Sequence, residues 1–195
     1  MNHTQLQDSF RAYFTEMGYE INWEGFALTL EIHVIHKGNY LFQQGEQANR
    51  LYFLHKGLMR YVSVSDTGKE FTQTFAKSPR IIGSTRSMVT QSPALFGIQA
   101  LEDCIVISYP WPTFFEQLQH DKNFLAFYIH FLENIFISKE ERESAFVKDS
   151  AECRYLNFCA DYPELKERVP LQQIASYIGI TPVALSRIRA KLSLN

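Results

Sequence analysis

The stretch HKGNYLFQQGEQANRLYFLHKGLMRYVSVSDTGKEF, residues 36–71, consists of short apolar and β-branched runs separated by glycine-containing turns. Many short strands with glycines between them are typical of an antiparallel sandwich or barrel. Asp66, Thr67 and Gly68 form the clearest predicted hairpin turn, because β-branched and aromatic runs lie on both sides of them. The pattern extends from Glu31 to about Tyr109, and it predicts one β domain over this range.

Helical spacing is found on both sides of the β-rich region. Residues 4–17 place large apolar side chains three and four positions apart, which predicts an amphipathic helix ending at Gly18. The sequence also allows a second short helix around residues 23–28. Helical spacing resumes at Thr113, after two prolines have ended the β region.

Residues 121–146 carry apolar side chains on two faces of one predicted helix. The first face holds Phe124, Leu125, Tyr128, Phe131, Leu132, Ile135 and Phe136, and the second holds Phe127, Ile129 and Ile137. A helix with two apolar faces must be covered from two sides. The β domain can cover one side, and for the other a second copy of the chain is favoured over an intramolecular covering. The residues expected in this dimer interface are Phe124, Tyr128, Phe131, Leu132 and Ile135.

Residues 170–195, PLQQIASYIGITPVALSRIRAKLSLN, have the pattern of helix, tight turn and helix. Gly179 supplies the permissive backbone for the turn, Thr181 is a good N-cap, and Pro182 suits the first helical turn. Small Ala175 lets the two helices cross closely. The buried faces are expected to hold Leu171, Ile174, Ala175 and Ile178 on the first helix, and Leu185, Ile188 and Leu192 on the second.

The outer surface of the second helix combines small, hydroxyl and cationic side chains, which suits a DNA major groove. Small residues allow close approach, arginine can donate two hydrogen bonds to guanine, and lysine can meet phosphate. From Arg168 onward the chain has a net charge of +4 and no acidic residue, so the net charge of the rest is −6. The residues expected to contact DNA are Thr181, Val183, Ala184, Ser186, Arg187, Arg189 and Lys191. A solvated basic tail and a helical hairpin that only packs are the alternatives.

Composition limits the possible classes of protein. The 195 residues, 46% of them hydrophobic, suffice for one sizeable core and a small satellite domain. No apolar run is long enough to cross a bilayer and no secretory leader is visible, so a cytoplasmic protein is expected. No nucleophile, base and orienting group converge in any stretch, so neither an enzyme nor a cofactor is predicted. No disulfide framework or metal site is expected from Cys104, Cys153, Cys159, His33, His36, His55 and His120.

On these segments the chain resembles the Crp/Fnr superfamily of bacterial transcription regulators, the relatives of the cyclic-AMP receptor protein. Residues 36–71 look like the family's cyclic-nucleotide-binding β-roll, with a glycine before LF followed by GE, LYFL and KG. IQALEDCIVISYPWPTFFEQL resembles the strand that ends the roll and the next helix, and YIGITPVALSRIRAKL resembles the recognition helix. The resemblance covers nearly the whole chain. It implies an α+β fold with a jelly-roll-like β-roll, a long dimerisation helix over about 113–147, and a C-terminal helix-turn-helix.

The cyclic-nucleotide cassette departs from the family's pattern. Family members that bind the nucleotide use a Gly-Glu pair for the ribose and an Arg followed by Ser or Thr for the phosphate. Here Ser84 follows Gly83 in place of the glutamate, and Ala94 and Leu95 occupy the places of the arginine and of the Ser or Thr. A buried phosphate without a guanidinium would be an uncompensated charge, so cyclic AMP is not expected to bind in the usual mode. The degenerate pocket is expected to comprise Gly83, Ser84, Thr85, Arg86, Ala94 and Leu95, and Arg80 with Arg86 leaves a different anion open.

The predicted recognition helix also departs from the family. Val183 stands where DNA-binding relatives commonly carry a glutamate, so the base preference should differ while phosphate anchoring remains. A wing after this helix is expected to be short or missing.

These observations predict a homodimeric DNA-binding transcription regulator, with a sensor domain over residues 1–147 and a helix-turn-helix domain over residues 148–195. The expected partners are double-stranded DNA and a second copy of the chain, with RNA polymerase and a small-molecule effector left open and no membrane. Two recognition helices would lie about 34 Å apart, in successive major grooves. One alternative is a cyclic-nucleotide-binding-like module whose C-terminal helices contact protein. A remote one is an enzyme that uses the β-roll pocket, as cupin-like folds can.

Overall fold

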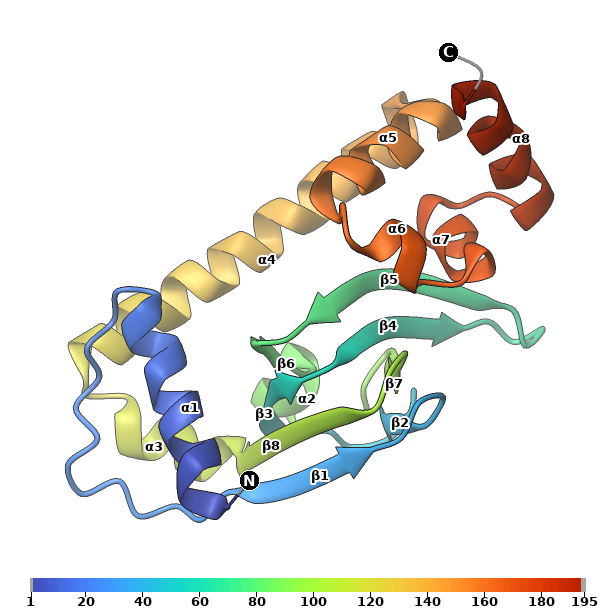
Figure 1. The fold of residues 1–195 in the computed structure, drawn as a ribbon. Coiled ribbons are helices and arrows are strands. Elements are labelled where there is room, and N and C mark those ends of the chain that lie inside the picture. Colours follow the sequence, from blue (N-terminus) through green and yellow to red (C-terminus); the bar gives the residue numbers. More distant parts are fainter. Residues whose placement is uncertain (1, 194–195) are drawn as a thin grey trace.

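The computed structural model describes residues 2–193, and it contains two four-stranded antiparallel sheets with helices packed around them (Figure 1). The first sheet has the order β1 (Glu31–Ile35), β8 (Cys104–Pro110), β3 (Arg50–Lys56) and β6 (Arg80–Ile82). The second has the order β2 (Tyr40–Phe42), β7 (Gly97–Ala100), β4 (Leu58–Val64) and β5 (Glu70–Lys77). The predicted antiparallel β-roll is confirmed.

The predicted hairpin joins β4 to β5. The Ser65 N–H donates to the carbonyl oxygen of Lys69 (2.9 Å), and the Gly68 N–H donates to that of Ser65 (2.8 Å). Gly68 has φ +77°, a conformation that residues with a side chain rarely adopt. Three short elements, β6, α2 (Thr85–Thr90) and β7, were not predicted, because none is long enough to show a periodic pattern.

The N-terminal helix α1 (His3–Glu16) confirms the amphipathic helix predicted there. The second short helix expected at residues 23–28 is wrong, because this segment is irregular and contains Gly25 at φ +74°. Aromatic packing holds it in place: the ring centroids of Trp23 and Phe10 lie 5.8 Å apart, and those of Phe26 and Phe114 lie 5.6 Å apart. Backbone N–H groups at both ends of the segment donate to distant side chains, that of Asn22 to Asp121 (2.9 Å) and that of Ala27 to Gln117 (3.2 Å).

Two helices follow the roll, α3 (Trp111–Leu118) and α4 (Lys122–Lys148), so the long helix expected over 113–147 is interrupted. Asp121 lies at the break and caps α4, accepting a hydrogen bond from the Phe124 N–H (2.8 Å). In Figure 1, α4 extends from α1 and α3 to the C-terminal helices, along the length of the molecule.

Three apolar clusters form the core. The first packs α1, α3 and the start of α4 on the β1–β8–β3–β6 sheet, and its largest buried members are Phe10, Phe14, Phe53, Tyr109, Phe114 and Phe124. The second lies between the two sheets. The third joins the roll to the last helices, which are α5 (Ala151–Asp161), α6 (Leu165–Arg168), α7 (Leu171–Ile178) and α8 (Pro182–Ser193).

Of the C-terminal helices, α7 lies directly against β5, on the outer side of its sheet, and α8 packs on α7 (Figure 1). Leu58, Phe75 and Leu101 of the roll share the third cluster with Phe158 of α5 and Ile174 of α7. No helix within residues 2–193 is both long enough and apolar enough to span a membrane.

Candidate nucleic-acid interface

Helices α7 and α8 meet at a tight turn centred on Gly179. This glycine has φ +78°, and the next N–H, of Ile180, donates to the carbonyl oxygen of Ala175 (2.9 Å). Thr181 caps α8, because its hydroxyl accepts a hydrogen bond from the Ala184 N–H (3.2 Å). Ala175 and Leu185 are fully buried where the helices cross, as expected from the small residue at 175. The turn glycine, the N-cap and the buried faces are therefore placed as predicted.

One face of α8 is left free by this packing. Val183, Ser186 and Arg187 are exposed on it, Val183 to 61%. Arg187 makes no hydrogen bond or ion pair with any other described residue. Thr181 is exposed at the start of the helix, and Ala184 is half-buried beside it. The free face thus combines an apolar group, a hydroxyl and an unpaired guanidinium, with no carboxylate.

The two remaining cations lie on the flanks of this face. Lys191 donates to the carboxylate of Glu152 on α5 (2.7 Å), and Arg189 is half-buried near Tyr155. At 100° per residue the two positions are about 200° apart around the helix. Arg189 and Lys191 therefore project to different sides of α8, and Lys191 carries a counter-charge that the sequence did not indicate.

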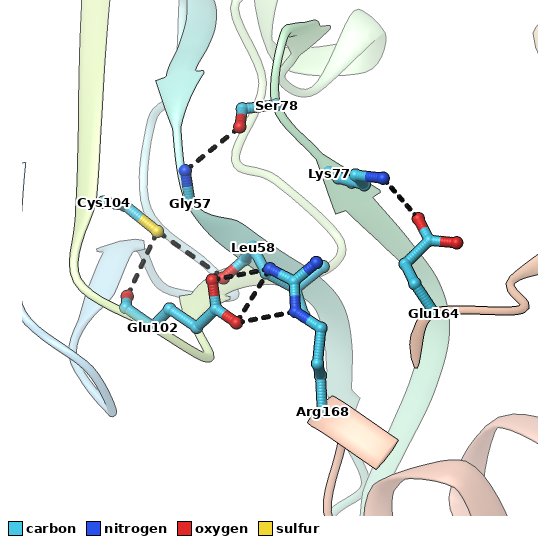
Figure 2. A network of polar contacts seen from close by, with 8 residues as sticks. All are labelled: Gly57, Leu58, Lys77, Ser78, Glu102, Cys104, Glu164 and Arg168. Atoms are coloured by element: carbon cyan, nitrogen blue, oxygen red, sulfur yellow. Dashed lines mark hydrogen bonds and ion pairs between the residues drawn. The ribbon is translucent and has the colours of Figure 1, made fainter. Parts of the chain in front are cut away.

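The C-terminal helices are docked on the roll by polar contacts as well as by the apolar cluster (Figure 2). Arg168 donates with Nη2 to both carboxylate oxygens of Glu102 (2.8 Å each), and Lys77 on β5 donates to Glu164 (2.6 Å). All four groups are partly exposed, so each pair contributes at most about 1 kcal/mol. The buried apolar contacts dominate the docking.

Residues of the predicted cassette make hydrogen bonds within the chain itself. The Ser84 side chain is buried and caps α2, accepting from the Ser87 N–H (3.2 Å). The Gly83 N–H donates to the Tyr61 hydroxyl (3.2 Å), and buried Ala94 has both backbone groups bonded to residues 45 and 46. Leu95 is 63% exposed, and its side chain has no polar atom. No side chain at 84, 94 or 95 supplies the carboxylate or the guanidinium of the family's cassette.

Aromatic side chains pack beside the cassette. The ring of Phe96 lies 5.1 Å from that of Tyr61 and 6.2 Å from that of Phe42, which in turn lies 5.8 Å from Tyr52. Arg86 is exposed and donates to the carbonyl oxygen of Pro93 (2.5 Å), and Thr85 starts the short helix α2. Within residues 2–193 no three His, Cys, Asp or Glu side chains are grouped so that they could hold a metal ion.

Helix α4 carries an exposed apolar stripe that differs from the one predicted. Phe124 is buried in the chain's own core, against Phe114 and Tyr128, so its assignment to a dimer interface is wrong. Tyr128 and Phe131 are partly covered by the same core. This stripe has coiled-coil spacing, and its members are Leu125, Ile129, Leu132 and Phe136. Ile129 is 57% and Phe136 64% exposed, whereas Leu125 and Leu132 are half-buried, Leu125 against the same core. Ile135, also predicted, is half-buried to one side of this stripe.

Comparisons with known proteins agree with this geometry. A family model for the cyclic nucleotide-binding domain matches residues 32–121, which span the β-roll and α3. The "Anaerobic regulatory protein" of Pasteurella multocida is 25% identical over 170 residues, which cover 81% of this chain and 61% of that protein. By these likenesses the chain is similar to proteins with a cyclic nucleotide-binding domain and to a regulatory protein. It spans less than two thirds of the length of this curated relative.

Solved Crp/Fnr-like structures have the same fold at low sequence identity. FixK2 from Bradyrhizobium japonicum superposes with a TM-score of 0.73 at 14% identity, covering 86% of each chain. The global regulator CLP of Xanthomonas campestris, described as responsive to c-di-GMP, gives a TM-score of 0.67 at 16% identity. That likeness covers 85% of this chain and 87% of CLP. These likenesses show a shared fold over most of the chain.

Proposed function

We propose that this chain is a DNA-binding transcription regulator of the Crp/Fnr type, with residues 1–147 as its sensor part and residues 148–195 as its DNA-binding part. The observation that carries the proposal is the free face of α8. Val183, Ser186 and Arg187 project from a helix whose opposite face is buried against α7, and within residues 2–193 Arg187 makes no hydrogen bond or ion pair. An unpaired guanidinium beside small side chains matches the donor needed for guanine in the major groove.

The names of the relatives support the same function. The curated relatives are called regulatory proteins, and several structural relatives are described as transcriptional regulators. None of these descriptions names a reaction. We propose the same regulatory role for this chain.

The test is selection of binding sites from a pool of random DNA duplexes by the full chain. We expect enrichment of an inverted repeat, in which each half-site contains a guanine for Arg187. Val183 offers only methyl groups, so a thymine is expected near that guanine. If no site is enriched, and Arg187→Ala leaves the affinity for DNA unchanged, the C-terminal helices serve protein contact and the proposal fails.

The dimer required by an inverted repeat would form through α4. Leu125, Ile129, Leu132 and Phe136 repeat at intervals of four, three and four residues, which is the spacing of a two-helix seam. Two copies joined along this stripe would each present one α8. The homodimer is part of the proposal, and light scattering of the purified chain measures whether it forms.

We further propose that cyclic AMP is not the effector. Ser84 is used as a helix cap, Ala94 is buried, and neither can neutralise a phosphate. Calorimetry with millimolar cyclic AMP should therefore give no saturable heat. Micromolar affinity would contradict this and would show that Arg80 or Arg86 provides the charge.

A further inference from the structure

Two arginines meet the C-terminal end of α7. Arg142 on α4 donates with Nη2 to the carbonyl oxygens of Tyr177 (2.7 Å) and of Thr72 on β5 (3.2 Å). Arg154 on α5 donates with Nε to the carbonyl oxygen of Ile178 (2.9 Å). Tyr177 and Ile178 are the last residues of α7, whose carbonyls have no partner within the helix. Cations at this end also interact favourably with the helix dipole.

A phenylalanine lies between the two guanidinium groups. The guanidinium carbon of Arg142 is 4.8 Å from the centre of the Phe146 ring, and that of Arg154 is 4.9 Å from it. Arg142 also lies over the Tyr177 ring, at 4.2 Å. A Cβ atom added at Gly179 would be 2.5 Å from Cε1 of Phe146, so the ring lies directly under the α7–α8 turn.

Arg142 is held without any acidic partner. Burial lowers the pKa of its guanidinium, which donates hydrogen bonds to the backbone carbonyls of Tyr177 and Thr72. A desolvated cation is costly unless its donors are satisfied. Here two carbonyls accept from Nη2 and two aromatic rings lie against the planar group, an arrangement that lysine cannot reproduce.

The same junction continues into the second sheet. The Ser176 hydroxyl on α7 accepts from the Thr72 N–H (2.9 Å) and donates to the carbonyl oxygen of Glu70 (3.2 Å). The side chains of Thr72 and Glu70 in turn bond to the guanidinium of buried Arg60 on β4. The free edge of β5 is therefore bound to α7 and α4, and this is the point where the sheet, the long helix and the DNA-binding helices are joined.

We propose that Arg142 is a positioning residue for DNA binding. Together with Phe146 and Arg154 it fixes the α7–α8 pair to the end of α4, so that α4 sets the distance between the two α8 helices of a dimer. The proposal rests on the proposed function. Its consequence is specific: loss of the clamp should leave base preference unchanged and make the protein tolerant of altered spacing between half-sites.

The experiment uses the full chain and duplexes that carry two selected half-sites at their natural spacing, or with one base pair added or removed. Arg142→Lys keeps the charge but loses the planar group, and Phe146→Leu removes the ring that both arginines contact. Lys139→Gln is the control, because Lys139 is exposed on the same helix and makes no hydrogen bond or ion pair with another described residue. Affinity is measured by fluorescence anisotropy, and folding by thermal unfolding.

For the wild type and Lys139→Gln we expect the altered spacings to bind at least about tenfold more weakly than the natural one. For Arg142→Lys and Phe146→Leu we expect about tenfold weaker binding at the natural spacing, the loss typical of one charged hydrogen bond, and a much flatter spacing profile. Binding to a single half-site should not change.

Equal weakening at all spacings, or a profile as sharp as that of the wild type, would overturn the positioning role. So would a wild type that binds two half-sites without any spacing preference. A wild type that enriches and binds no DNA would instead refute the proposed function, so the two failures are distinguishable.

Discussion

Gly179→Ala tests the packing of the α7–α8 turn against α4. Alanine at φ +78° costs about 1–2 kcal/mol, because the left-handed conformation brings Cβ too close to the backbone. The new Cβ would also lie 2.5 Å from the Phe146 ring, which is 42% exposed and can move. If the ring moves, its cation–π contacts with Arg142 and Arg154 are lost, at about 0.5–1 kcal/mol each. The substitution should therefore lower the free energy of unfolding by about 2–4 kcal/mol.

A double-mutant cycle with Phe146→Ala separates the two causes. Phe146→Ala alone sacrifices the same ring contacts, and it also makes room for the new Cβ. The double variant should then be about 1–2 kcal/mol more stable than the sum of the single effects predicts. Urea unfolding followed by circular dichroism measures all four proteins. Additive effects would show that the ring does not restrict residue 179, and they would remove the contact on which the clamp depends.

Three further predictions concern the DNA-binding face and the dimer. Arg187→Ala should weaken the free energy of binding to the selected site by about 1–3 kcal/mol and relax the preference at one base pair, as measured by anisotropy titration. Unchanged discrimination at that base pair would exclude a guanine contact. Glu152→Gln removes the counter-charge of Lys191, so DNA affinity should rise for all sequences. The slope of log affinity against log salt concentration should steepen by about one unit. A slope equal to that of the wild type would show that Lys191 does not contact phosphate. Phe136→Glu places a charge in the exposed stripe of α4 and should give a monomer by light scattering, while Ser138→Glu, exposed on the opposite face of the helix, should behave as the wild type does.

Local signals in the sequence were sufficient for the hairpin at Asp66–Gly68 and for the α7–α8 pair. In both cases a glycine with positive φ lies between periodic apolar runs, and Thr181 adds a cap. These features depend only on residues a few positions apart. The same holds for α1, whose buried residues follow helical spacing throughout.

Features that depend on distant residues could not be predicted. Periodicity showed two apolar faces on α4, but it could not show that Phe124 faces the chain's own core, which depends on where α3 lies. Lys191 pairs with Glu152, and Arg142 with the carbonyl of Thr72, 39 and 70 residues away. Neither pairing leaves a pattern in one sequence, because charged side chains on exposed helices are common everywhere.

Chemical footprinting of the selected DNA site with dimethyl sulfate tests most directly whether α8 enters the major groove. Dimethyl sulfate methylates N7 of guanine, which lies in that groove. With the wild-type protein we predict protection of one guanine in each half-site, the two being about one helical turn apart, and loss of both protections with Arg187→Ala. A bound site without protected guanines, or with protections that Arg187→Ala leaves in place, would contradict the proposed function.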